Sequence, residues 1–181
     1  MAIDTFIWFD HTGAAAALEV VGETQDDRFK KGGSGPAGAF GAFEIKDWSF
    51  DVQNKTTIGS ATGGAGGGKA EFAEFTITKA VDTASPAFFK NCVAGAHYKE
   101  VVLACRKAGA DPTSAGKEYL TYTFSTVFTT KVAWKHGDDG PAEDITFVYG
   151  QLKIEYLPQD KTGKLANPKI AGWSVLTNKS V

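Results

Sequence analysis

The sequence has few of the residues that build metal sites and disulfide frameworks. Its 181 residues include only two cysteines and three histidines. Two cysteines cannot form the disulfide framework of a small secreted domain, so we predict that Cys92 and Cys105 are buried free thiols. A metal site using Cys92, His97 and Cys105 would lack the paired short spacings of zinc ligands. We therefore expect neither a metal nor another cofactor.

Long apolar runs and a strong net charge are also lacking. No run approaches the ~20 residues that a membrane helix requires, and residues 1–6 lack the basic start and apolar block of a secretion signal. A net charge of −2 and a pI near 5.9 argue against a nucleic-acid partner. With 43% apolar residues, the chain can fill one sizeable core. We expect a single domain, folded where it is made and exported only by a dedicated machine.

No catalytic constellation is evident. Residues 63–69 have the spacing of a phosphate-binding loop up to the lysine, but Ala70 follows in place of the magnesium-binding hydroxyl, and a strand pattern replaces the helix. Residues 138–140 match only a fragment of a calcium loop, so a turn is the better interpretation. The histidines lie in unrelated segments, and no serine or cysteine has the elbow of a nucleophile. We predict that the chain is not an enzyme.

Strand patterns dominate what is present. We predict strands over residues 3–9, 43–54, 69–81, 98–106, 117–134 and 145–156. In the last of these the apolar side changes phase at Gly150-Gln151: the first set is Ile145, Phe147 and Tyr149, and the second is Leu152, Ile154 and Tyr156. Such a change requires a bend or an extra residue, and glycine permits the bend. A similar change is centred on Lys46-Asp47.

The strand over 117–134 alternates between apolar and hydroxyl side chains. This pattern predicts a core on one side and water on the other. The apolar face comprises Leu120, Tyr122, Phe124, Phe128 and Val132. The polar wall face comprises Thr121, Thr123, Ser125 and Thr129.

One short α-helix is expected at about 86–94. Ser85 suits the N-cap, Pro86 the first helical position, and Gly95 the position just beyond the end. An apolar stripe follows from Phe88, Phe89, Cys92 and Val93. Because the predicted strands are longer than the usual ~5–6 residues, we expect a mainly β fold, a compact antiparallel β-barrel with this flanking helix and long loops.

Two regions depart from the strand pattern. Residues 11–42 form an alanine- and glycine-rich insertion, predicted to be mostly loop. The tail at about 158–181 is polar until residues 171–176. Apolar residues near the end of a tail indicate docking, so we predict that Trp173, Val175 and Leu176 dock the tail.

Several segments, taken in order, resemble the Hcp family, the haemolysin-coregulated tube proteins of bacterial type VI secretion. They are residues 68–79, 81–86, 97–101, 105–109 and 145–154, followed by residues 171–179, which are similar to the ending of longer members. The resemblance covers most of residues 43–157. The insertion at 11–42 departs from it, because the family has a short charged loop there.

The resemblance implies a compact β-barrel whose copies form hexameric rings that stack into a hollow tube. A contractile sheath ejects such tubes, with a spike protein at the tip and effector proteins in the lumen. It also implies a cytoplasmic protein during assembly that is then secreted without a cleaved signal, and that neither enters membranes nor binds nucleic acid. The polar wall face would suit a lumen, although the sequence leaves open whether it lines the lumen or the outside.

The glycine-rich loop at 54–69 is our candidate for contact with an adjacent ring or subunit. Glycines let backbones approach closely, and long loops in compact domains tend to be functional. The residues that we assign to this contact are Thr57, Gly59, Ser60, Gly64, Gly67 and Lys69.

Two other functions fit parts of the pattern. A phage-type tail tube protein would share the same architecture. A carbohydrate-binding β-sandwich is the alternative from another class, because four tryptophans and many threonines could form a sugar platform. Against it, most aromatic residues have the spacing of core positions.

Overall fold

In the computed structural model, residues 3–13, 18–56, 69–107, 118–137, 139–158 and 166–181 are described. They contain eleven strands and one helix. The elements are β1 (Ile3–Asp10), β2 (Phe43–Glu44), β3 (Asp47–Ser49), β4 (Val52–Asn54), β5 (Ala70–Phe72), β6 (Phe75–Ala80), α1 (Ser85–Ala94), β7 (His97–Lys107), β8 (Glu118–Gly137), β9 (Gly140–Tyr156), β10 (Lys169–Ser174) and β11 (Lys179–Ser180). The expectation of a mainly β fold with one short helix is confirmed.

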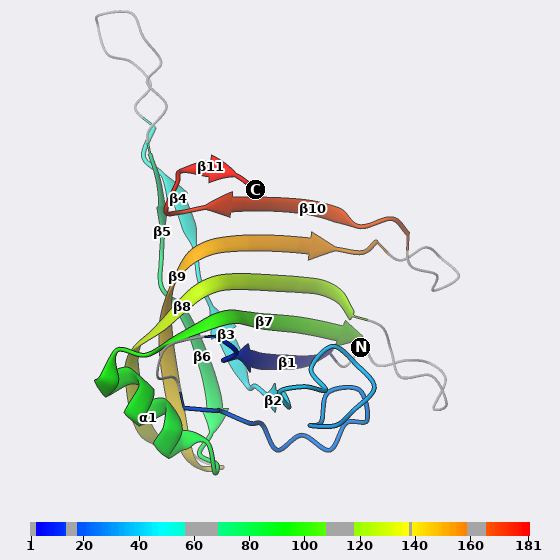
Figure 1. Cartoon of the computed structure of the whole chain (residues 1–181), viewed down its shortest axis with the longest axis vertical. Helices are drawn as coiled ribbons and strands as arrows, with labels where there is room; N and C mark the ends of the chain where they lie inside the picture. The colour runs from blue at the N-terminus through cyan, green and yellow to red at the C-terminus, as the bar shows by residue number, and fades with distance from the viewer. Residues whose placement is uncertain (1–2, 14–17, 57–68, 108–117, 138, 159–165) are drawn as a thin grey trace, which may run out of the picture.

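Nine of the strands form one antiparallel sheet, in which β9 changes partner halfway along. The main path is β11-β10-β9-β8-β7-β1-β2 (Figure 1). The first half of β9 pairs with β6, and its second half pairs with β10, while β8 lies along its whole length. β8 ends at Gly137, β9 begins at Gly140, and these two glycines are paired, so the strands form the hairpin that the turn composition predicts.

The phase change predicted in the last long strand is confirmed, and it extends across three strands. In each of β7, β8 and β9 the buried side chains switch from one alternate set of residues to the other, and the switches lie side by side across the sheet. On one side of the switch the buried, mutually paired residues are Tyr98, Val127 and Tyr149, and on the other side they are Val101, Phe124 and Leu152. At this switch Thr126 has a φ of 54°. Gly150 of β9, which lies beside Thr126 in the sheet, is buried, and a Cβ added to Gly150 would lie 2.9 Å from the Leu176 side chain. The three strands β7, β8 and β9, which we call the wall, therefore bend together at this place.

The core lies inside this bend. Phe9 is fully buried, and its ring lies 5.0–5.8 Å from the rings of Phe43, Phe88, Tyr98 and Phe147. Burial of each such side chain contributes about 2–3 kcal/mol before entropy losses. One aromatic cluster thus joins β1, β2, α1, β7 and β9.

The strands predicted at 43–54 and 69–81 are each broken in the structure. The first becomes β2, β3 and β4, because β2 pairs with β1 whereas β3 pairs with β6. The second becomes β5 and β6, because β5 pairs with β4 whereas β6 pairs with β3 and β9. Val52 in β4 is 47% exposed. Alternation alone does not reveal where a strand exchanges partners.

The predicted polar face of β8 holds only on one side of the bend. Thr121, Thr123 and Ser125 are partly exposed, opposite buried Phe124. Beyond Thr126 the faces reverse, so Thr129 is buried and Phe128 is exposed. The assignment of Thr129 to the water-facing polar side of the strand was wrong, because the bend inverts the alternation.

The helix spans Ser85–Ala94, and its capping differs at one end from the prediction. The N-cap is Ala84 without a side-chain hydrogen bond, so Ser85 is not the cap. Gly95 has a φ of 64° and ends the helix as predicted. In the predicted stripe Phe88 is buried, but Phe89 and Val93 are 51% and 73% exposed.

Closure of the sheet into a barrel is not confirmed. Within the described residues the strand pairing is an open path from β11 to β2, with β6 and β3 branching from β9.

Residues 18–42 form a loop that packs tightly on the outer face of β1 and β7. Phe29 is fully buried, and its ring stacks on Phe6 at a centroid distance of 4.0 Å. A Cβ on Gly22 would lie 1.8 Å from the carbonyl oxygen of Ala42, so only glycine fits. The glycines at such positions permit close packing. The second apolar cluster comprises Phe6, Trp8, Phe29, Ala37, Ala42, Val102 and Ala104.

Candidate assembly surfaces

A buried ion network fixes α1 to the sheet. Lys79 on β6 lies opposite Glu143 on β9, with 2.8 Å between Nζ and Oε1, and both side chains are almost completely buried. Lys79 also contacts Asp82 at 2.7 Å, and the Ser85 hydroxyl donates to Glu143. The network holds the first turn of the helix, so the residues at 81–86 that resemble the Hcp family have a structural role.

Two further polar contacts fasten the 18–42 loop. Asn91 on α1 is buried, accepts a hydrogen bond from the Leu18 amide at 2.7 Å and donates to the Leu18 carbonyl at 3.0 Å. Arg106 on β7 contacts Asp4 at 2.9 Å and Asp26 at 2.7 Å. The loop is therefore tied to α1 at its first residue and to β7 at Asp26.

A groove of about 520 Å³ separates this loop from the polar wall face. Arg28 spans one side of it and binds both carboxylate oxygens of Glu118, at 2.8 and 3.1 Å. The groove is lined by Trp8, Asp10, Arg28, Pro36, Phe40, Glu100, Val102, Ala104, Glu118, Thr121, Glu155 and Leu157.

The carboxyl group of Asp10 in this groove has a lowered pKa. Partial burial alone would raise the pKa, but hydrogen bonds from Thr12 and the nearby Lys99 ammonium group outweigh that effect.

An apolar patch lies between α1 and the far end of β8. Phe89 is 51% exposed and Trp134 54%, and their rings are 6.0 Å apart. They border a shallow cavity of about 410 Å³ together with Val81, Asp82, Ser85 and Pro86. We call Val81, Phe89, Val93 and Trp134 the helix patch. The apolar stripe of α1 is wider than the face that packs on the sheet, so the sequence pattern did not reveal this exposed patch.

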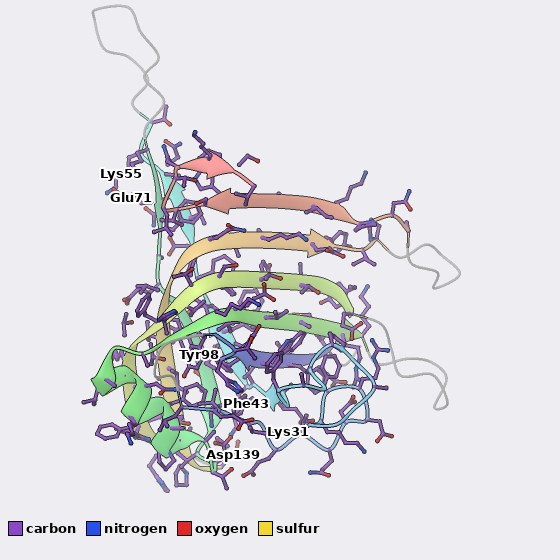
Figure 2. The ribbon with its side chains drawn as sticks, in the orientation of Figure 1. Lys31, Phe43, Lys55, Glu71, Tyr98 and Asp139 are labelled. Atoms are coloured by element: carbon purple, nitrogen blue, oxygen red, sulfur yellow. The ribbon has the colours of Figure 1, made fainter. Side chains whose placement is uncertain are left out.

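The β4–β5 ribbon lies at the opposite end of the molecule (Figure 1). Its strands pair only with each other within the described part of the chain, and Lys55 contacts Glu71 across them at 2.8 Å (Figure 2). Of the residues predicted for inter-ring contact, only Lys69 is described, and it is exposed. Thr57, Gly59, Ser60, Gly64 and Gly67 lie outside the described residues.

The tail returns to the sheet as β10, antiparallel to β9. Trp173 lies opposite Leu152 and is partly buried, and Val175 packs against the core. Leu176 is 75% exposed and covers Gly150. The structure places these three predicted residues together at one edge of the sheet.

No three His, Cys, Asp or Glu side chains in the described ranges lie close enough together to hold a metal ion. Both cysteines are free; Cys105 is buried as predicted, but Cys92 only partly. Burial raises the pKa of the Cys105 thiol. Among the described elements, no helix has the length and apolarity needed to cross a membrane.

These features define a β-rich protein with a bent sheet, a polar face and exposed apolar side chains beside α1. The chain matches the family described as "Type VI secretion system effector, Hcp" over residues 18–156. It belongs to that family, so the resemblance is confirmed. The match begins inside the 11–42 segment.

Individual relatives agree with this assignment. The chain is 30% identical over 113 residues to protein Hcp1 of Pseudomonas aeruginosa, covering 61% of this chain and 68% of the relative. A solved type six secretion system protein is 29% identical with a TM-score of 0.81, covering 99% of this chain and all of that one. Hcp1 from Salmonella typhimurium has the same fold, with 23% identity, a TM-score of 0.70 and full coverage of both chains.

The carbohydrate-binding alternative has little support from the tryptophans. Trp8 is 5% exposed, and Trp48 and Trp173 are partly buried. Only Trp134 is more than half exposed. A sugar platform requires several exposed aromatic faces, so the type VI secretion tube protein is the class that fits.

Proposed function

We propose that this chain is the subunit of the inner tube of a type VI secretion machine and has no catalytic role. Hexameric rings of the chain stack into a hollow tube, which a contractile sheath ejects with a spike protein at its tip and effector proteins in its lumen. The tube assembles in the cytoplasm and leaves with the machine. Membership of the Hcp family over residues 18–156 is the observation that carries this proposal.

The proposal includes a closed barrel, with closure through residues 43–49. The Ile45 amide donates to the Thr5 carbonyl of β1 at 3.1 Å, and the next amide, Lys46, donates to Thr78 of β6 at 2.8 Å. Adjacent residues of one segment thus bond to the two strands that closure must join. This supports a continuous wall through β1, β2, β3, β6, β9, β8 and β7.

The proposed lumen face is the polar wall face on one side of the bend. Thr121, Thr123 and Ser125 share their face with Glu155, Lys153 and Gln151 of β9 through cross-strand pairing. The two charges on β9 are opposite in sign and 3.9 Å apart, so this hydroxyl-rich part of the surface binds water well and its paired β9 residues add no net charge. Because Thr129 is buried, the proposed lumen face ends at the bend.

Ring closure requires a head-to-tail contact between different surfaces of neighbouring copies. The free edge of β10 supports such a contact. One edge of β10 pairs with β9, and β11 covers only Trp173 and Ser174 on the other. In the described residues Lys169–Ala171 have no strand partner on that side. An unpaired edge is a template for another chain.

The loop at 54–69 is proposed to contact an adjacent ring or subunit, on the basis of its glycine-rich sequence. Deletion of residues 59–67 should then leave a folded protein that does not stack into tubes. Unchanged tube formation by the deletion variant would reject this role.

Native mass spectrometry and negative-stain microscopy of the purified chain test the proposed function. We expect a hexamer mass and six-fold rings. A chain that remains monomeric at high protein concentration would refute the proposal.

A further inference from the structure

We propose that the groove between the 18–42 loop and the polar wall face binds an extended segment of another protein, which carries a basic side chain and, two residues further along, an apolar one. The inference does not rest on ring formation, because one copy of the chain supplies every residue that lines the groove. The partner is recognised by one positive charge and one apolar side chain at a fixed spacing.

The floor of the groove is built from paired residues of β1 and β7. Trp8 lies opposite Val102, and the next pair on the same face of the sheet is Asp10 opposite Glu100. The first pair is apolar and well buried, with 5% and 8% exposed, and the half-buried Phe40 of the loop stands beside it in the groove lining. The groove therefore has an apolar row next to an acidic row.

The acidic row is unfavourable in the chain alone. Carboxylates directly opposite each other on neighbouring strands repel, and the Asp10 side chain is only 16% exposed. Asp10 is compensated by hydrogen bonds from Thr12 and by Lys99 at 3.7 Å. Within the described part of the chain no ion pair compensates Glu100, which is partly buried. Binding of a cation at Glu100 explains why this row is acidic.

The other carboxylates of the groove already have cations. Arg28 binds both oxygens of Glu118, and Lys153 lies 3.9 Å from Glu155. One negative charge, that of Glu100, is left for a partner. The described residues hold no group of three ligands for a metal ion, so an organic cation fits better. Charge complementarity of this kind selects a partner and speeds its association.

The spacing of the two rows matches an extended chain. The rows lie two residues apart along β1 and β7, which is about 6.6–6.8 Å. Side chains two residues apart in an extended segment point to the same side at the same spacing of about 6.6–6.8 Å. An arginine or lysine that reaches Glu100 therefore places the second following side chain against Trp8 and Phe40. The volume of about 520 Å³ has room for a few side chains.

The first experiment uses three synthetic peptides and the full chain. Acetyl-Ser-Arg-Ser-Leu-Ser-amide should bind, as measured by a saturation-transfer NMR titration. Peptides with Glu in place of Arg, or with Ser in place of Leu, should bind about tenfold more weakly, because each lacks one of the two contacts. Added salt should weaken binding of the first peptide. Equal binding of the three peptides would overturn the inference.

Glu100→Gln separates a binding role from a structural one. The variant keeps the size of the side chain and removes its charge, so binding of the arginine peptide should fall about tenfold. Its melting temperature should be unchanged or higher, because repulsion with Asp10 is relieved. Glu71→Gln is the control, since Glu71 is an exposed carboxylate on β5 that does not line the groove. Unchanged binding, or a lower melting temperature, in the Glu100 variant would contradict the inference.

The same titration on separated ring and monomer fractions distinguishes a partner protein from a second copy of this chain. Equal binding by both fractions supports a partner segment. A peptide that binds the monomer but is excluded from the ring would show that copies of the chain cover the groove, and would overturn the inference. A chain that binds the peptide and forms no ring would refute the proposed function and leave this inference supported.

Discussion

Lys79 and Glu143 form an ion pair with 2.8 Å between Nζ and Oε1, and their side chains are 1% and 0% exposed. The pair joins β6 to β9 beneath the first turn of α1. The ammonium group also lies 5.1 Å from the centre of the Phe43 ring. Two charges in such an apolar site stabilise the fold only while both are present.

Removing one partner of this pair should be severe. Glu143→Ala is expected to lower the free energy of unfolding by about 3–5 kcal/mol, because it leaves Lys79 buried without its carboxylate. The double variant Lys79→Met with Glu143→Leu should recover much of that loss, because no unpaired charge remains. Denaturant unfolding measures both. Lys135→Ala, which breaks an exposed pair with Asp144, is the control, and a similar loss there would contradict the argument.

Asn91→Leu should loosen the 18–42 loop. The substitution removes two hydrogen bonds to the Leu18 backbone and one to the Tyr98 hydroxyl. We expect a loss of about 2–3 kcal/mol, since the buried Tyr98 hydroxyl and the part-buried Leu18 backbone groups lose their partner. Limited proteolysis should show faster cleavage near the start of the loop. Cleavage at the unsubstituted rate would show that Asn91 does not hold it.

Gly22→Ala should be poorly tolerated. Its Cβ would lie 1.8 Å from the Ala42 carbonyl oxygen, so the backbone of the loop would have to move. We expect a loss of about 1–3 kcal/mol, typical of overpacking. Gly137→Ala is the matched control, because the nearest atom there is 3.8 Å away. Equal thermal unfolding of the two variants would refute the close packing.

Tyr149→Phe should change the alkaline limit of stability. Burial raises the pKa of Tyr149 to about 12, above the unfolded value of about 10. The neutral phenol therefore contributes stability that is fully present below pH about 10 and is lost as the pH rises toward 12. The phenylalanine variant should lose less stability in that window. At neutral pH it should be as stable or up to about 1 kcal/mol more stable, because the buried hydroxyl has no hydrogen-bond partner among the described residues.

Unfolding curves at neutral pH and between pH 10 and 12 provide the measurement. Tyrosinate absorbance should show one late-titrating group that is missing from the variant. An early titration of Tyr149 would contradict its burial.

Trp173→Ala tests whether the tail is docked. Trp173 pairs with Leu152 across β10 and β9 and is partly buried. Its removal should cost about 2–3 kcal/mol and lower the melting temperature. If the variant leaves both melting and ring mass unaltered, the tail contributes nothing to the fold.

The bend of the wall shows which structural features can be predicted from the local sequence pattern and which cannot. The parity change at Gly150 was predictable because apolar residues must stay on the buried side. The matching bend at Thr126 was not, since threonine at a φ of 54° carries no glycine signal. Val127, an apolar residue at a position of the polar face by alternation, is fully buried. The same unrecognised bend caused the wrong placement of Thr129.

The strand-rich fold, the position of the helix, the turn that joins β8 to β9 and the family were predictable from the amino-acid sequence. They depend on alternation, glycine and proline positions and ordered motifs, all of which are local in the chain. The packing of the 18–42 loop, the pairing of Lys79 with Glu143 and the outward face of half of the helix stripe became apparent only in three dimensions. Those outcomes depend on which distant surfaces compete for the same apolar area, and residues far apart in the chain determine them together.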